Sequence, residues 1–334
     1  TDARKWAQST EAAVQEGRYF RTSEAKRHTL GEAIDRYIRD RLPLKRSSTR
    51  KGQKAQLEWW KARLGNYTLA DLTPAVIAQG RDDLAATPVK RGEKETPRSP
   101  ASVTRYLAVL SHLCTIAVKE WGWMQENPAQ KITRPQEPRG RVRFLNKAER
   151  AALLAACRES GNEFLYDVVL LALSTGMRKG EILGLTWGAV DFQRRTITLE
   201  ETKNGERRVV PIVGPVYGAL TERSRIRRID SPYVFPAPQR YGKAPQPIDI
   251  TSAWRVAVKR ANLKDFRFHD LRHSAASELA MSGATLPEIA VVLGHKTLAM
   301  VQRYAHFCPD HVSGVLERMT DKVFGDGTQE GTGS

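Results

Sequence analysis

The chain has few of the features that mark secreted, membrane-spanning or disulfide-rich proteins. Its 334 residues include only three cysteines, Cys114, Cys157 and Cys308, which are far apart and form no CxxC pair. This spacing argues against a disulfide framework or a cysteine zinc cluster and favours the reducing cytoplasm. No apolar run approaches the length of a membrane span, and the N-terminus lacks the apolar segment of a secretory signal. We therefore expect no membrane partner.

Acidic residues are scarce relative to basic ones. The chain holds 37 Asp and Glu against 54 Lys and Arg, a formal net charge of +17. Such an excess favours a polyanionic partner. Residues 1–143 carry 28 basic and 16 acidic side chains, whereas residues 144–334 carry 26 and 21. The N-terminal part is therefore predicted to grip the polyanion, and the C-terminal part to be a compact enzyme core.

Helical periodicity predicts a compact helical domain over residues 28–126. The dipeptide Thr73-Pro74 is typical of a helix cap followed by a proline in the first turn. Segment 88–100 is rich in charge and proline and is predicted to be an exposed basic loop. Four helices joined by short connections form such a domain. The predicted helices cover about 30–41, 50–64, 74–86 and 101–121.

Two segments flank this domain. Residues 1–27 include a polar stretch compatible with a helix, and we expect it to be an N-terminal extension, the tail of an upstream element. Residues 127–143 contain three prolines, a glycine and few apolar side chains, which is typical of a linker. This linker is basic, and it is equally well explained as a solvated connector or as a strand of chain lying along a phosphate backbone.

The C-terminal part, 144–308, combines helices with one clear hairpin. Residues before Gly176 form apolar helices, and Asn204-Gly205 separates two alternating segments, which is the strongest short hairpin signal. Thr285 and Glu288 match a capping box. The predicted fold class is therefore mainly α with a small antiparallel β-sheet, in two domains. Further helices are predicted over about 252–261, 270–281, 286–293 and 297–307.

Six polar residues of this part together suit the chemistry of a phosphodiester. A phosphodiester needs its nonbridging charge neutralised and its leaving oxygen protonated. The set offers one tyrosine nucleophile and five hydrogen-bond donors, most of them cationic. Taken singly, each has an ordinary explanation, such as a solvated hairpin lysine, a loop histidine or a core tyrosine. The six are Arg178, Lys203, His269, Arg272, His295 and Tyr304.

The order of these residues resembles that of the tyrosine recombinase (phage integrase) family, Arg…Lys…His-x-x-Arg…His…Tyr. The resemblance covers about residues 145–307, through STGMRKGE, ETKNGERR, HDLRH, LGH and the segment ending at Tyr304. It implies a catalytic domain of the DNA breaking-rejoining fold over 144–308 and, on a weaker pattern, a core-DNA-binding domain over 28–126. It also suggests that residues 1–27 are the remnant of an arm-binding domain.

The resemblance assigns a role to each of the six residues. It implies that Tyr304 is the nucleophile that forms a 3′-phosphotyrosyl link, and that Lys203 protonates the 5′-oxygen leaving group. It gives Glu181 an orienting role. The remaining residues act on the phosphate, Arg178 and Arg272 as clamps, His295 as a hydrogen-bond donor and His269 as an aid to proton movement.

A metal site is the alternative for part of this set. His269 and His273 stand four residues apart, as zinc ligands on a helix do. However, HDLRH lacks the internal glutamate of HExxH, no third ligand stands out, and Arg272 lies between the two. We expect no metal and no cofactor.

The expected function is site-specific recombination of duplex DNA for a phage or another mobile element. The resemblance implies a homotetramer on DNA, with a monomer or weak oligomer when free, and accessory DNA-bending or directionality proteins. The alternatives are a type IB topoisomerase-like enzyme, a non-catalytic DNA-binding protein of the same fold and a helical regulator. Residues 309–334 are expected to form a C-terminal helix and tail with one apolar stripe. This stripe packs on its own domain or, as the family suggests, on a neighbouring protomer. It comprises Val312, Val315, Leu316, Met319 and Val323.

Overall fold

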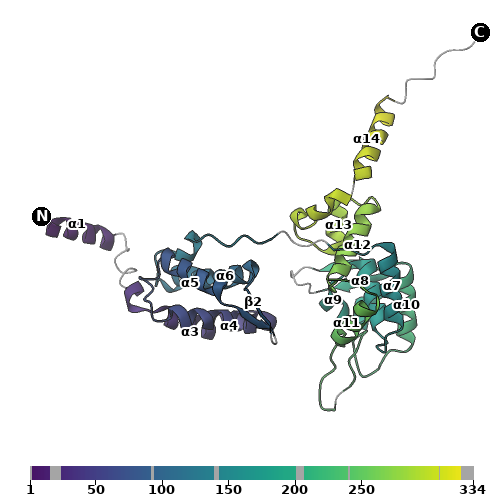
Figure 1. Ribbon diagram of the computed structural model, residues 1–334, viewed down its shortest axis with the longest axis horizontal. Helices are drawn as coiled ribbons and strands as arrows, with labels where there is room; N and C mark the ends of the chain where they lie inside the picture. The colour runs from purple at the N-terminus through teal and green to yellow at the C-terminus, as the bar shows by residue number, and fades with distance from the viewer. Residues whose placement is uncertain are drawn as a thin grey trace, which may run out of the picture. The chain divides into compact units, whose positions relative to one another are not determined.

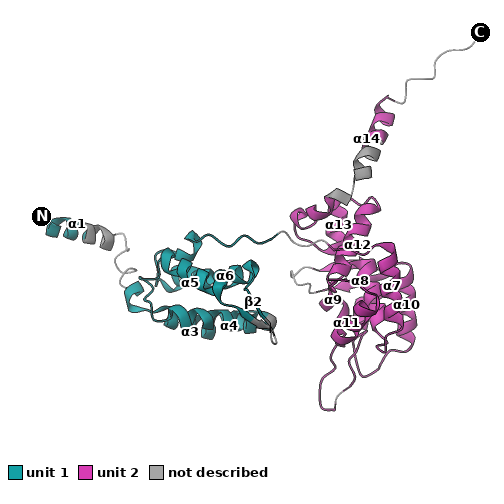
Figure 2. Cartoon of the chain, in the orientation of Figure 1, with its two compact units in different colours: residues 1–140 teal, residues 141–334 magenta. Residues whose placement is uncertain are grey.

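The protein is mainly helical with a small antiparallel sheet, as predicted (Figure 1). The computed structural model describes residues 2–15, 24–91, 94–138, 143–200, 207–239, 241–307 and 309–324. The chain divides into two compact units, residues 1–140 and 141–334 (Figure 2). Each unit has its own hydrophobic core.

Unit 1 is built around four helices, and three of them, α3, α5 and α6, begin at a side-chain cap. Thr29 closes a capping box with Glu32, and Thr73 accepts a hydrogen bond from the backbone of Val76. Trp60 is fully buried and donates its indole N–H to the carbonyl of Tyr106, which ties two helices together. The elements are α1 (Asp2–Gln15), α3 (Leu30–Asp40), η1 (Leu42–Leu44), α4 (Ser47–Leu64), α5 (Pro74–Ala86), β1 (Val89–Arg91), β2 (Lys94–Thr96), α6 (Pro100–Ile116), η2 (Ala117–Trp121) and η3 (Pro128–Lys131).

The prediction of a loop over 88–100 is wrong, because a short antiparallel hairpin, β1–β2, lies there. Val89 pairs with Thr96, and Arg91 pairs with Lys94. Two β-branched residues thus face each other at the open end, where such side chains stabilise strand pairing. The basic and proline-rich composition hid this signal in the sequence.

The helix predicted over about 101–121 is present, but the expectation that no apolar run approaches the length of a membrane span is wrong by length and composition. The continuous stretch Pro100–Trp121 is long and apolar enough, by length and composition alone, to cross a membrane. Its inward side chains, among them Val103, Leu107 and Leu110, are buried in the core of unit 1. We therefore interpret it as the core helix of this unit.

The first residues of the predicted linker pack into unit 1. Asn127 is buried, and its amide donates to the carbonyl of Ser111 and to the hydroxyl of Thr115. Ala129 and Ile132 join the same core. Composition alone could not reveal this, because the anchoring contacts reach back to α6.

Unit 2 places a helical bundle beside a three-stranded antiparallel sheet in the order β3-β4-β5. Helix α8 is buried over most of its length and lies against α7, α10 and α12. The elements are α7 (Lys147–Arg158), α8 (Leu165–Thr175), α9 (Lys179–Leu183), η4 (Trp187–Ala189), β3 (Val190–Asp191), β4 (Thr196–Leu199), β5 (Arg208–Pro211), α10 (Pro215–Arg225), α11 (Thr251–Arg260), α12 (Asp270–Met281), α13 (Leu286–Leu293), η5 (Leu298–Met300), η6 (Gln302–Phe307) and α14 (Pro309–Phe324).

The single helix predicted over 297–307 is wrong, since two short 3₁₀ helices, η5 and η6, occupy these residues. The backbone N–H of Tyr304 bonds to the carbonyl of Val301, three residues back. A 3₁₀ helix brings residues i and i+3 into line, so Val301 and Tyr304 are both buried against α12 and α13. The tighter winding thereby turns the tyrosine toward the residues of α12.

Candidate functional site

Arg272 joins the ends of two helices. It lies in the first turn of α12 and is only 3% exposed. Its Nη1 donates to the carbonyl of Gly176 over 2.7 Å, and its Nη2 donates to the carbonyl of Leu293 over 2.5 Å. These carbonyls are the C-terminal ends of α8 and α13, where the helix dipole favours a cation. Burial, together with the guanidiniums of Arg178 and Arg208, lowers the pKa of Arg272 to about 9, which leaves it charged at neutral pH.

The helices α8 and α13 both end on a left-handed glycine, as the sequence predicted for Gly176. Gly176 has φ of +62°, and a Cβ there would lie 2.4 Å from Cδ2 of Leu293. Gly294 has φ of +64°, and a Cβ there would lie 2.8 Å from Cδ of Arg208. Both positions therefore require glycine for the backbone angle and for the close approach.

Arg178 is held in place by the carboxylate of Glu181. Nη1 of Arg178 donates to Oε1 of Glu181 over 2.6 Å, while its Nη2 lies 3.4 Å from the carbonyl of Gly294. Glu181 is nearly buried, and its other oxygen accepts from Arg208 over 2.9 Å. One carboxylate thus serves two arginines, which leaves a net positive charge at this point. This geometry supports the orienting role that the resemblance suggested for Glu181.

The sequence reading missed Arg208. It is the first residue of β5, and its Nη1 donates to the carbonyl of Val292 over 2.6 Å. Burial is the main cause that lowers its pKa, and the charge of Arg178 adds to it. Strand alternation could have revealed this inward position, because Val210, two residues further along β5, faces the core.

His295 follows Gly294 directly and is neutral. Burial, followed by Arg272 and Arg178, lowers the pKa of His295 to about 4. Its Nδ1 is buried and has no hydrogen-bond partner among the residues that the structure describes. A buried polar atom without a partner is costly, and an arriving ligand would satisfy it. The ring thus stands close to the two arginines that the sequence predicted as phosphate clamps.

Tyr304 is 1% exposed and packs with Ala276, Ile289 and Leu293. Its hydroxyl lies 2.5 Å from Nδ1 of His273. Burial raises the pKa of Tyr304 and outweighs Arg303 and Arg272, which lower it. The cations therefore do not activate the phenol in the DNA-free protein.

The two predicted residues that remain are His269 and Lys203. His269 occupies the N-cap position of α12 and is exposed, with its ring 5.3 Å from that of His273. Lys203 lies in 201–206, outside the described residues, between β4 and β5. The structure therefore brings Arg178, Arg272 and His295 together, with Tyr304 close to Arg272.

The zinc interpretation of His269 and His273 gains no support. Nδ1 of His273 contacts the hydroxyl of Tyr304. Within the described part of the chain, no group of three or more His, Cys, Asp and Glu side chains is arranged to hold a metal ion.

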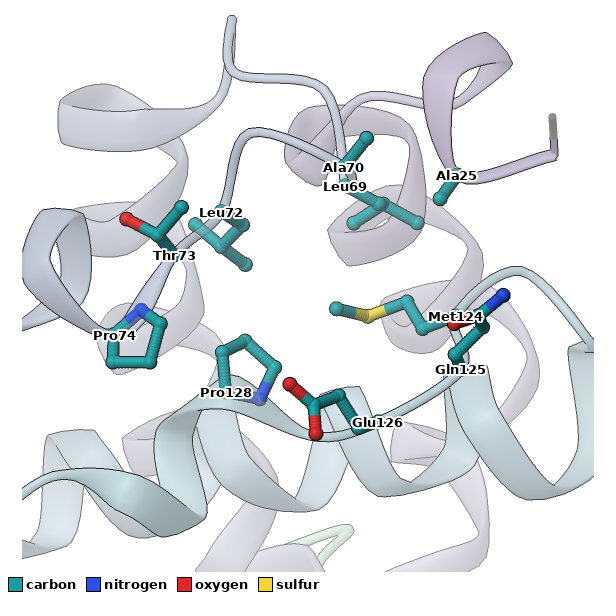
Figure 3. A pocket seen from close by; sticks show the side chains of 10 residues that line it. All are labelled: Ala25, Leu69, Ala70, Leu72, Thr73, Pro74, Met124, Gln125, Glu126 and Pro128. Carbon is teal, nitrogen blue, oxygen red and sulfur yellow. The ribbon is translucent and has the colours of Figure 1, made fainter. Parts of the chain in front are cut away.

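A pocket in unit 1 offers no comparable chemistry (Figure 3). It has a volume of about 240 Å³ and is lined mainly by apolar side chains such as Leu69, Leu72 and Met124. Its carboxylate, Glu126, accepts two hydrogen bonds from Lys131. Arg178, Arg272 and His295 lie instead in unit 2, where α8, α9, α12 and α13 meet.

A tyrosine beside arginines and histidines, in a mainly helical fold with a small sheet, is the arrangement expected of a tyrosine recombinase. A sequence model of the phage integrase family matches residues 143–311, half of the chain. The shufflon-specific DNA recombinase of Escherichia coli is 32% identical over 89% of this chain and 75% of its own length. The chain belongs to the phage integrase family and is a tyrosine site-specific recombinase.

A further relative agrees with this assignment, and solved structures share the fold. The integrase of Salmonella phage P22 is 30% identical over 70% of this chain, and the match spans 60% of its own length. The fold resembles that of the Tn1549 transposon integrase, solved with a circular intermediate DNA, with a TM-score of 0.68 at 19% identity over 87% of this chain and 99% of that one. A lambda integrase dimer bound to a core site gives a TM-score of 0.64 at 20% identity, over 83% and 95% of the two chains.

Proposed function

We propose that this recombinase cuts and rejoins duplex DNA by transesterification through Tyr304, to integrate or excise a phage or another mobile element. The observation that carries the proposal is the convergence of Arg178, Arg272 and His295 at the ends of α8 and α13, beside Tyr304. Two guanidiniums and a neutral imidazole would form a binding site for a phosphate, because the N–H groups of a planar guanidinium donate in pairs to phosphate oxygens.

A bound phosphate would offset the excess positive charge of the DNA-free site. Arg178 and Arg208 share the carboxylate of Glu181, Arg272 lies close enough to be affected by both arginines, and the pKa values of Arg208 and Arg272 are lowered. A scissile phosphate would neutralise this excess and give Nδ1 or Nε2 of His295 an oxygen to contact. The same donors would stabilise the added negative charge of the transition state, which is where such groups lower the barrier.

The reaction is a pair of exchanges at phosphorus. The hydroxyl of Tyr304 attacks the phosphate, forms a 3′-phosphotyrosyl link and displaces the 5′-oxygen, which Lys203 protonates. The 5′-hydroxyl of a second strand then displaces the tyrosine. The energy of the phosphodiester is kept in the phosphotyrosine, so the exchange needs no nucleotide cofactor.

The N-terminal unit would bind the DNA backbone, and the C-terminal unit would carry out the cleavage and rejoining. Residues 28–126 and the basic segment that follows would grip the phosphate backbone, in keeping with the larger positive charge of the N-terminal part. Residues 144–308 would carry the chemistry. Phosphate contacts would dominate affinity and make it strongly dependent on salt. We place the protein in the cytoplasm, with the nucleoid DNA.

Helix α14 supports a tetrameric assembly on DNA. Its apolar side chains Leu316, Met319, Val323 and Phe324 are between 49% and 73% exposed. Val312 and Val315, predicted for the same stripe, lie on α14, but their side chains are not among those that the structure describes. We infer that this exposed face binds a second copy of the chain during synapsis. Removing residues 309–334 should leave half-site binding intact and suppress recombination between paired sites. Normal recombination by the truncated protein would contradict this role.

The experiment that tests the proposed reaction uses a nicked half-site DNA whose cleaved 5′ fragment diffuses away. The wild-type protein should accumulate a covalent adduct that survives denaturing electrophoresis, and Tyr304→Phe should bind the DNA without forming it.

A further inference from the structure

The attack of Tyr304 on the phosphate requires a group that accepts the phenolic proton. We propose that His273 is a further catalytic residue, which holds the Tyr304 hydroxyl before attack and accepts its proton as the tyrosine–phosphorus bond forms. The inference rests on the proposed function, because it concerns the same nucleophile. It is carried by the contact of 2.5 Å between Nδ1 of His273 and the hydroxyl of Tyr304.

The local fold builds this contact from two elements. His273 follows Arg272 on α12, and the 3₁₀ winding of η6 turns Tyr304 toward the same helix. The contact lies in the part-buried interior, where few waters can compete for the hydroxyl. Arg272, which would bind the phosphate, and His273, which contacts the nucleophile, are therefore consecutive residues of α12.

The surroundings of His273 keep its imidazole neutral. His269, Asp270 and Arg272 act on it from α12, and Arg303 and Tyr304 from η6. Burial, followed by the other cationic groups, lowers the pKa of His273 to about 4, and only Asp270 opposes the shift. With the ring proton on Nε2, Nδ1 accepts from the phenol.

Two protons move during the cleavage step, one from Tyr304 and one to the 5′-oxygen. The Oη–H bond of Tyr304 breaks and its proton passes to Nδ1 of His273, while the Oη–P bond forms and the P–O5′ bond breaks. The 5′-oxygen takes its proton from Lys203. In the rejoining step, the attacking 5′-hydroxyl gives its proton to the neutral amine of Lys203 and forms the P–O5′ bond, while the Oη–P bond breaks and the imidazolium of His273 returns its proton to the oxygen of Tyr304.

The pKa values of Tyr304 and His273 disfavour proton transfer between them until DNA is bound. Burial raises the pKa of Tyr304 and lowers that of His273, so the free protein keeps its phenol protonated. The phenolic oxygen loses its basicity only as it bonds to phosphorus, and transfer to His273 then becomes favourable. The pair thus protects the nucleophile from ionising without a substrate.

The test compares two substitutions of His273 by single-turnover cleavage of the half-site DNA at saturating protein. His273→Asn keeps an oxygen that can accept the hydroxyl hydrogen bond but cannot take the proton at neutral pH. His273→Ala removes both functions. A matched control is His112→Ala, because Nδ1 of His112 lies 2.8 Å from the hydroxyl of Tyr37 in unit 1.

We expect both His273 variants to bind DNA normally and to cleave it about 10²–10⁴ times more slowly, the usual contribution of general acid–base catalysis. His112→Ala should cleave at the wild-type rate. The wild-type rate should fall on the acidic side of its pH profile, and this limb should be absent from His273→Asn. A 5′-phosphorothiolate at the scissile position should not rescue either variant, since the defect lies at the nucleophile.

Three results would overturn the inference. They are wild-type cleavage by His273→Asn, an unchanged acidic limb in that variant, and rescue by the sulfur leaving group. None of them affects the proposed function, which fails separately if the wild-type protein forms no adduct at Tyr304.

Discussion

The side chain of Arg208 crosses Gly294 so closely that a Cβ at Gly294 would lie 2.8 Å from Cδ of the arginine. The arginine continues to Glu181 and to the carbonyl of Val292. The strand that follows Lys203 is thus fastened to the loop that carries His295. This contact gives the glycine of the LGH segment a structural reason, beyond its left-handed backbone.

Gly294→Ala should therefore impair the site more than an ordinary loop substitution. The left-handed angle alone costs an alanine about 1 kcal/mol, and the added methyl group must also displace Arg208. We expect lower stability in urea unfolding and slower cleavage of half-site DNA. Gly283→Ala is the matched control, because Gly283 also has positive φ, +86°, but nothing lies within 4 Å of its Cβ position. Equal effects of the two substitutions would show that the contact with Arg208 is unimportant.

Arg178→Ala and Arg272→Ala should differ in stability but not in chemistry. Each should slow cleavage by about 10²–10³, the usual cost of one lost oxyanion donor. Arg272→Ala should also lower the free energy of unfolding by on the order of 3 kcal/mol, because the buried carbonyls of Gly176 and Leu293 lose their donors. Arg178→Ala should lower the free energy of unfolding by less, since Glu181 still accepts a hydrogen bond from Arg208. Arg272→Lys keeps the charge but loses the paired N–H donors of the guanidinium, and therefore tests whether those donors are needed. Near-wild-type cleavage by any of these variants would show that the substituted arginine does not act on the phosphate.

The protein should lose stability as the pH falls from about 6.5 toward 4. In the folded protein the pKa values of His273 and His295 are lowered to about 4, whereas an unfolded histidine has a pKa near 6.5. The unfolded chain then binds these protons first, so acid favours unfolding in this window. Urea midpoints at pH 7 and pH 5 measure the loss. The double variant His273→Asn, His295→Asn should lose less than the wild type, and an equal loss would contradict the assignment.

Lys203→Ala should be rescued by a 5′-phosphorothiolate at the scissile position. A sulfur leaving group departs without protonation, so a general acid becomes dispensable. Comparing single-turnover rates on oxygen and sulfur substrates separates this role from binding. Equal impairment on both substrates would assign Lys203 to DNA binding.

Local signals predicted most of the helices and several of their ends, but they missed α10 and the 3₁₀ winding of 298–307. Thr73 and Thr285 cap helices where the sequence placed them, and Gly176 ends α8. These features depend on residues only a few positions apart. The hairpin β1–β2 and the anchoring of Asn127 depend on pairing and on contacts to α6, and neither was predicted.

The candidate site was predicted as a set of residues rather than as a geometry. The order of motifs pointed to Arg178, Arg272, His295 and Tyr304, which the structure places together. It could not show that Arg208 shares Glu181 with Arg178, because that contact joins residues 27 positions apart. Nor could it show that Tyr304 faces His273, since this depends on 3₁₀ winding in place of the α-helix that the periodicity favoured.

The most direct test of the central claim is to locate the covalent bond. The adduct formed on half-site DNA should be digested with protease, and the DNA-linked peptide identified by mass spectrometry. We predict a 3′-phosphate linked to Tyr304 in the wild-type protein and no adduct with Tyr304→Phe, which keeps the ring and its packing against Ile289 and Leu293. An adduct on another residue, or one that persists in Tyr304→Phe, would contradict the account.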